Sequence, residues 1–218
     1  MLFLPVSEGL PWDQKYFRLF ISHINQHKNI ASDIQSYLAQ YNITCFVAHN
    51  DISPTAEWEN VIKDRLHSCD AVLALLHPGF HQSFWTDQEI GIALGLDKLI
   101  ISLDYGENPY GFMGRFQAMK TSNQSINVIC DQLFELLRYH PMTKRRISEI
   151  IVNMFRDSAN FDQAKKNIGL IEKLEYWDDS LSQLAKKGVE ENFQISNAWD
   201  VPERLNKYIN NWKNYIQF

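Results

Sequence analysis

Short apolar segments recur roughly 25 to 30 residues apart through the first half of the chain, and this spacing constrains the fold most. They lie at 17–22 (FRLFIS), 44–48 (TCFVA), 71–76 (AVLALL) and 99–103 (LIISL). The third contains only Ala, Val and Leu, which is typical of a strand buried on both faces. Helical spacing of apolar residues separates the segments. The pattern therefore predicts βαβ units and a parallel sheet with helices on both faces.

The intervening helices are predicted over 30–41, 58–66 and 83–96, and a short fifth strand over 116–119. Ligands of such sheets bind outside the carboxyl ends of the strands. In this chain, those ends are at 22–23, 48–49, 77–78 and 104–105.

From about Gln124 onward the strand pattern disappears and only helical periodicity remains. Apolar residues at 147, 150, 151, 154 and 155 form one helical stripe. Further helices are predicted over 168–174, 181–185 and 201–216, the last with Pro202 in its first turn. Pro141 ends a helical pattern and marks the join. We therefore expect a first domain over 14–139 and an all-α helical domain over 140–218.

The distribution of charge excludes some function classes. The formal charge is −5, and residues 1–123 hold 8 Lys/Arg against 13 Asp/Glu, which argues against a nucleic-acid surface there. No apolar run is long enough to span a bilayer, and residues 1–5 do not resemble a signal peptide. Cys45, Cys69 and Cys130 are expected to be buried thiols. We expect a soluble cytoplasmic protein with no membrane or nucleic-acid partner.

Several motifs follow one another along the first half of the chain. The stretch 20–23 (FISH) resembles the opening motif of bacterial TIR domains, and 46–54 (FVAHNDISP) resembles that family's second strand and BB loop, in the right order and spacing. The stretch 77–89 (HPGFHQSFWTDQE) matches the pattern of strand, loop, Ser-x-Trp and then Glu four residues after Trp. The stretch 108–112 (NPYGF) resembles the loop after the fourth strand. The resemblance implies a flavodoxin-like α/β fold with a five-stranded parallel sheet, and covers about half of the chain.

The resemblance also implies cleavage of the bond between nicotinamide and ribose in NAD⁺, which is then a substrate and not a cofactor. The expected catalytic carboxylate is Glu89. Trp85 lies four residues earlier, so both side chains share one helix face and Trp85 would form an aromatic wall. Ser83 is a candidate N-cap and also a candidate for contact with the substrate. A carboxylate stabilises the oxocarbenium character of the ribose, and nicotinamide leaves as a neutral ring without protonation.

Other candidates for contact with the substrate come from the strand ends and the BB loop. Phe20 and Ser22 are candidates for the floor of the cleft, while His23 and His49 could line it. Asp51 belongs to the BB loop, which in TIR domains often moves or mediates assembly.

Two histidine pairs, 23/27 and 77/81, are each spaced by four residues, but neither is completed by Cys, Asp or Glu, so we expect no metal site. The chain also departs from better-known TIR domains. His77 replaces a common serine, and the first loop offers only His23, His27 and Lys28 to a pyrophosphate.

Two function classes stay open, with a third as a weaker alternative. The first is an NAD⁺-cleaving enzyme of phage defence, similar to the stand-alone TIR proteins of Thoeris-like systems, whose ADP-ribose-type product a separate effector protein reads. The second is a non-catalytic TIR adaptor that binds partner proteins, since fold does not determine function. The third is a nucleoside deoxyribosyltransferase-like hydrolase. Self-association, through the loop at 51–55 or the helical tail, is expected for the enzyme.

Overall fold

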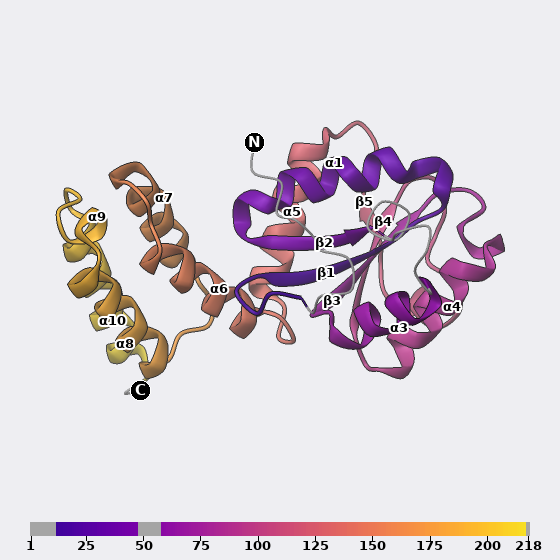
Figure 1. The fold of residues 1–218 in the computed structure, drawn as a ribbon. Coiled ribbons are helices and arrows are strands. Elements are labelled where there is room, and N and C mark those ends of the chain that lie inside the picture. Colours follow the sequence, from indigo (N-terminus) through magenta and orange to yellow (C-terminus); the bar gives the residue numbers. More distant parts are fainter. Residues whose placement is uncertain (1–11, 48–57, 217–218) are drawn as a thin grey trace. The chain divides into compact units, whose positions relative to one another are not determined.

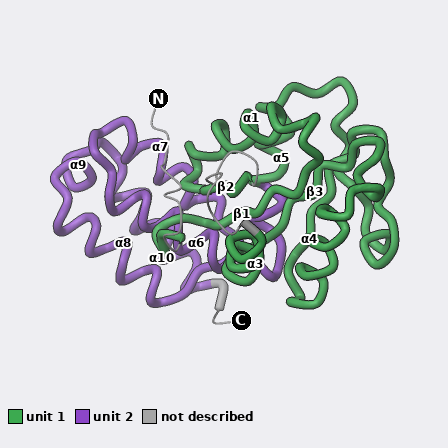
Figure 2. The backbone as a smooth tube through the Cα atoms, turned by 45° about the vertical axis from the view of Figure 1, so that its right-hand side comes forward, with its two compact units in different colours: residues 1–134 green, residues 135–218 purple. Residues whose placement is uncertain are grey.

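A computed structural model of the chain describes residues 12–47 and 58–216. The chain forms two compact units, residues 1–134 and 135–218, which Figure 2 distinguishes by colour. The strands of the first unit are β1 (Phe17–Ser22), β2 (Ile43–Val47), β3 (Ala71–Leu76), β4 (Leu99–Asp104) and β5 (Met119–Lys120). Its α-helices are α1 (Lys28–Leu38), α3 (Trp58–Ser68), α4 (Phe84–Gly95) and α5 (Ile126–Tyr139), which runs into the second unit. Its 3-10 helices are η1 (Asn25–His27), η2 (Ala39–Tyr41), η3 (Phe80–Gln82) and η4 (Gly111–Arg115).

The five strands form one sheet in the order β2-β1-β3-β4-β5, and every neighbouring pair is parallel. The predicted five-stranded parallel sheet is therefore confirmed. Arg18 and Asp70 connect β1 to the start of β3 at the amino ends of the two strands. The carboxylate of Asp70 accepts hydrogen bonds from the backbone N–H of Arg18 (2.8 Å) and from the Nε of its side chain (3.0 Å). At the carboxyl ends, Ser22 pairs with Ala74, and Ala74 pairs with Ser102.

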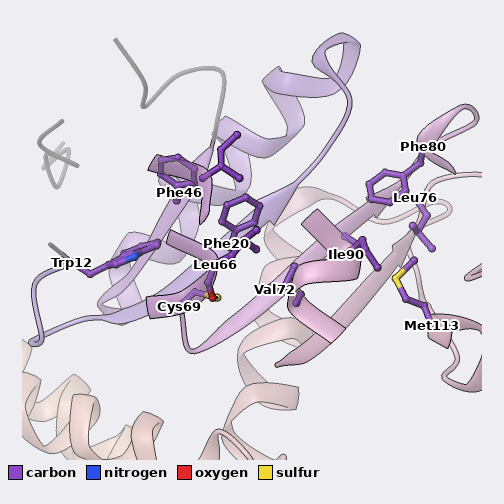
Figure 3. Packing of buried hydrophobic residues seen from close by; sticks show 13 residues of the cluster. Trp12, Phe20, Phe46, Leu66, Cys69, Val72, Leu76, Phe80, Ile90 and Met113 are labelled. Carbon is purple, nitrogen blue, oxygen red and sulfur yellow. The ribbon is translucent and has the colours of Figure 1, made fainter. Parts of the chain in front are cut away.

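Helices cover both faces of the sheet, with α3 and α4 on one face and α1 on the other (Figure 1). Tyr41 stacks on Phe134 of α5 with ring centroids 4.1 Å apart, which joins α5 to the α1 side. On the α3/α4 side, strand residues Phe20, Val72 and Leu76 pack with Leu66 of α3 and Ile90 of α4 (Figure 3). This core is what holds α4 against the carboxyl half of β1 and β3.

The predicted and observed strands differ at their ends. The second strand begins at Ile43, one residue earlier than predicted, and the fourth extends through Asp104. The fifth strand is only Met119–Lys120, so the prediction of 116–119 was largely wrong. Phe116 is the C-cap of η4 and has 58% of its surface exposed, and residues 116–118 lie in neither helix nor strand, so the strand begins only at Met119. All three cysteines are buried free thiols, as expected.

The second unit is built from helices alone in the part that the structure describes. After the end of α5 come α6 (Lys144–Arg156), α7 (Phe161–Ile171), α8 (Asp179–Glu191), α9 (Phe193–Ser196) and α10 (Val201–Ile216). The predicted stripe of α6 is buried at Ile147, Ile150, Ile151 and Phe155. The helix expected through Leu174 ends at Ile171, and the short α9 was not predicted because four residues show no periodicity.

Close approach of α6 and α8 depends on Gly188, which is buried in α8. An added Cβ there would lie 3.1 Å from the Cα of Arg156, closer than ordinary van der Waals contact. Gly169 of α7 differs, because its added Cβ would lie 3.8 Å from the nearest atom, Nη2 of Arg204.

We expect Gly188→Ala to destabilise the protein by about 1 to 2 kcal/mol, because overpacking outweighs the gain in helix propensity. The matched variant Gly169→Ala should stabilise it by about 0.5 to 1 kcal/mol. Urea unfolding followed by circular dichroism measures both. A stabilising Gly188→Ala would show that the two helices separate at little cost.

Candidate active site

The residues of the site are brought together by α4, which begins immediately after Ser83. The Ser83 side chain accepts a hydrogen bond from the backbone N–H of Thr86, so the predicted N-cap is confirmed. The buried residues of α4 are Thr86, Glu89, Ile90 and Ala93, a spacing of i, i+3, i+4 and i+7. Glu89 therefore occupies a position in the stripe that faces the sheet, where an apolar residue is the usual choice.

Glu89 is 6% exposed and accepts a hydrogen bond from the hydroxyl of Ser22, with 2.6 Å between Oγ and Oε2. Burial raises the pKa of Glu89 to about 7, and the hydrogen bond from Ser22 acts in the opposite direction. Desolvation disfavours the charged carboxylate, whereas a donated hydrogen bond favours it. Near neutral pH the carboxyl group is therefore divided between its protonated and ionised forms, which is typical of functional carboxylates.

A cavity of about 660 Å³ lies beside Glu89. Its walls come from the residues after β1, the residues after β3, the first turns of α4 and one residue of α3. The lining residues are His23, Ile24, Asn25, Gln26, Ile62, Pro78, Gly79, Gln82, Ser83, Trp85 and Glu89. The cavity lies where the chain leaves β1 for one side of the sheet and β3 for the other, which is the usual ligand position in such folds.

Four of the residues predicted from the sequence line this cavity: Glu89, Trp85, Ser83 and His23. Trp85 is 41% exposed and Glu89 is almost fully buried, so the shared helix face runs from the mouth of the cavity to its base. The Nδ1 atom of His23 lies 3.3 Å from the carbonyl oxygen of Ile21. This contact orients the ring at the end of β1.

Two other predicted residues lie behind the cavity wall. Ser22 is 1% exposed and reaches the site through Glu89, and is not among the lining residues. Phe20 is fully buried in the core, where its ring centroid is 5.3 Å from that of Phe46. The expectation that Phe20 forms the floor of the cleft is not met, because Phe20 precedes the carboxyl end of β1 by two residues. His49 and Asp51 lie outside the described residues.

Seven lining residues were not predicted as site residues, and three of these carry side-chain amides: Asn25, Gln26 and Gln82. Asn25 and Gln26 directly follow the carboxyl end of β1, and Gln82 lies within the motif that identified Glu89. Position after a strand end was the signal that could have found the first two. Their amide groups can donate and accept hydrogen bonds, whereas the described lining holds no lysine or arginine.

Stacked rings follow β3 next to this cavity. The ring of His77 stacks on His27, with centroids 3.3 Å apart, and on Tyr105, with centroids 4.5 Å apart. Burial lowers the pKa of His77 to about 4, with smaller contributions from His27 and His23. His77 is therefore neutral at physiological pH. The described residues include no group of three or more His, Cys, Asp or Glu side chains arranged to hold a metal ion.

Comparison with known proteins decides the family. The family model described as "TIR domain" matches residues 19–134, which is slightly more than half of the chain. The chain belongs to the TIR-domain family. The matched span of this TIR protein contains all the lining residues of the cavity and the whole sheet beyond the first two residues of β1.

Two solved TIR structures match this TIR protein. The TIR domain of the Toll-related receptor TRR-2 from Hydra magnipapillata is 17% identical, with a TM-score of 0.46, over 54% of this chain and 94% of that domain. The TIR domains of the activated Roq1 resistosome, which directly recognises the pathogen effector XopQ, are 13% identical, with a TM-score of 0.39, over 72% of this chain and 98% of that one. A comparison with curated proteins found no match. None of the described helices has the length and apolar character needed to cross a membrane.

We expect Glu89→Gln to stabilise the TIR protein at pH 8 by about 2 kcal/mol, because it removes a buried charge. The folded-state pKa of Glu89, about 7, lies above its ordinary value of 4.5, so the wild-type protein loses stability as pH rises between them. The gain from the substitution should therefore shrink as the pH falls from 8 to 5.5. Urea unfolding at the two pH values measures this difference.

The matched control is Asp87→Asn, which changes an exposed carboxylate on the same helix and keeps an acceptor for the hydroxyl of Tyr110. Its effect should stay within about 0.5 kcal/mol at both pH values. An equal gain from Glu89→Gln at pH 5.5 and pH 8 would mean that Glu89 does not titrate in this range.

Proposed function

We propose that this TIR protein cleaves the bond between nicotinamide and ribose in NAD⁺, with Glu89 as the catalytic carboxylate. The observation that carries the proposal is a buried Glu89, bonded by Ser22, at the base of a cavity whose rim holds Trp85. Burying an ionised carboxylate is unfavourable unless another interaction compensates for its desolvation. During the reaction, the developing positive charge on the oxocarbenium-like ribose would supply such an interaction.

The proposed reaction requires few protein groups besides this carboxylate. As the bond breaks, positive charge moves from the nicotinamide ring to the ribose, and the ionised Glu89 stabilises it there. Nicotinamide leaves as a neutral ring, so a separate general acid is not required. Because the described residues exclude much of the water around Glu89, its interaction with developing charge is stronger than in bulk solvent.

The remaining parts of the dinucleotide would be held by neutral groups. Trp85 lines the cavity with 41% of its surface exposed, and its ring would form the aromatic wall beside a base or nicotinamide. The amides of Asn25, Gln26 and Gln82 can donate hydrogen bonds to phosphate oxygens and accept them from ribose hydroxyls. The product would be ADP-ribose when water attacks, or a cyclic ADP-ribose, with one water fewer, when the substrate's own adenine attacks. As a signal in bacterial phage defence, such a product would act on a separate effector protein.

Exposed aromatic residues favour a second candidate function, an adaptor that binds partner proteins. Phe84 is 83% exposed and Phe112 is 81% exposed, both in the TIR unit. Exposed aromatic side chains are enriched at protein interfaces. An adaptor would bind its partner equally well with or without the Glu89 carboxylate, which separates the two functions experimentally.

We expect Glu89→Gln to reduce nicotinamide release from NAD⁺ by about 100- to 1000-fold, the effect of removing one electrostatic stabiliser of a transition state. Liquid chromatography with mass spectrometry measures nicotinamide and identifies the co-product. Asp87→Asn, on the same helix but outside the cavity lining, should keep near wild-type activity. The assay covers a series of protein concentrations, because self-association is expected to activate the enzyme. Equal activity of wild type and Glu89→Gln would contradict the proposal, as would inactivity of both even in extract from phage-infected cells.

Trp85→Ala should raise the KM for NAD⁺ about tenfold, equivalent to the loss of about 1.4 kcal/mol of stacking, with a smaller effect on kcat. Trp85→Phe should show a smaller rise in KM because an aromatic face remains. Steady-state kinetics of both variants tests this. An unchanged KM for Trp85→Ala would place the substrate away from the rim of the cavity.

A further inference from the structure

The hydrogen bond between Ser22 and Glu89 connects two buried side chains that are 67 residues apart in the sequence. Ser22 is 1% exposed and Glu89 is 6% exposed, so water does not compete for this bond. A hydrogen bond to an ionised acceptor in a poorly hydrated environment is stronger than one at the surface. Among the described residues, Ser22 is the one hydrogen-bond donor to Glu89, and it contacts only Oε2.

The backbone fixes where this hydroxyl lies. Ser22 is the last residue of β1 and pairs with Ala74 of β3. It shares a face of the sheet with Phe20, whose ring packs in the core below α4. Ala74, which pairs with Ser22, belongs to the same buried cluster as Ile90 and Ala93 of α4. The hydroxyl is therefore held by the sheet, and not by a loop.

We propose that Ser22 is a positioning residue for the reaction, whose hydroxyl holds Oε2 of Glu89 and so orients the other carboxylate oxygen, Oε1, toward the cavity. The inference rests on the proposed function, since it assigns Ser22 to the same site. Bonding one oxygen restricts the rotation of the carboxyl group about its last side-chain bond. It also stabilises the ionised form that the chemistry requires.

The hydrogen bond from Ser22 opposes the unfavourable effect of burial on the ionised form of Glu89. Burial raises the pKa of Glu89 to about 7, and the bond from Ser22 restrains that rise. Without the hydroxyl, the pKa of Glu89 should rise by about one further unit, the usual size of a hydrogen bond to a charged group. Activity that depends on the ionised carboxylate would then begin at a higher pH.

The test is the pH dependence of kcat for nicotinamide release by the full chain. In Ser22→Ala, the acidic limb should move up by about one pH unit, with a loss of up to about tenfold near pH 6.5 and partial recovery at pH 8.5. Ser22→Thr keeps a hydroxyl and should return the limb toward the wild-type position. Ser22→Cys, with a weaker donor, should fall between them and serves if Ser22→Ala does not fold. A loss of activity that is uniform across pH would overturn the inference and leave Ser22 a purely structural residue.

The matched control is Ser102→Ala, which removes a buried hydroxyl from the same row of the sheet, on β4. It should leave the acidic limb where it is. A limb that shifts equally in Ser102→Ala would show that any cavity in this row produces the effect, and would overturn the role of Ser22.

A direct titration of Glu89, by carbon NMR of protein labelled at the glutamate carboxyl, needs no substrate. Glu89→Gln assigns the resonance. A higher pKa of Glu89 in Ser22→Ala supports the inference that the Ser22 hydroxyl stabilises the ionised form of Glu89. If wild type then releases no nicotinamide, the proposed function alone fails. An unchanged pKa alongside an active wild type would overturn the inference about Ser22 and leave the proposed function intact.

Discussion

Parallel pairing of β1 with β3 is the constraint on which the rest of the TIR unit depends. The pairing is tied at its amino end by Arg18 and Asp70 and continues to Ser22 and Ala74 at its carboxyl end. Because β1 leads toward β2 and β3 toward β4, the chain departs in opposite directions at this point, which opens the cavity beside Glu89. A shift of register by one residue would turn Ser22 to the α1 side and separate it from Glu89.

Glu89 is well placed for the proposed reaction, but burial at this position disfavours its ionised form. Glu89 lies in the buried stripe of α4, where the same helix offers Ile90 and Ala93 to the core. The carboxyl group is disfavoured by burial and favoured by one hydrogen bond, so its ionisation is balanced near neutral pH. Groups balanced in this way are common at functional sites, where stability is given up for reactivity. His77, buried beside the cavity and neutral, adds no charge to this balance.

Much of the fold could be predicted from the sequence because its signals are local. The strands at 17–22 and 71–76 match the structure at both ends, since each short apolar segment is followed by a polar residue, His23 or His77. The amphipathic stripe of α6 was equally clear, whereas β5 and the short α9 were missed or misplaced because two to four residues carry no periodicity. The TIR motifs led to Glu89 and Trp85, and helical geometry placed them on one face.

By itself, then, the sequence determined the order of elements, the parallel sheet, the cap at Ser83 and the pairing of Trp85 with Glu89 on one helix face. Each of these depends on residues close together in the chain. Only the tertiary structure decided that Phe20 lies in the core, that Ser22 bonds Glu89, and that His77 stacks between His27 and Tyr105. Burial and long-range contact set these outcomes, and both are properties of the packed chain: the pKa of Glu89 rises above its ordinary value only once β1 and α4 have come together.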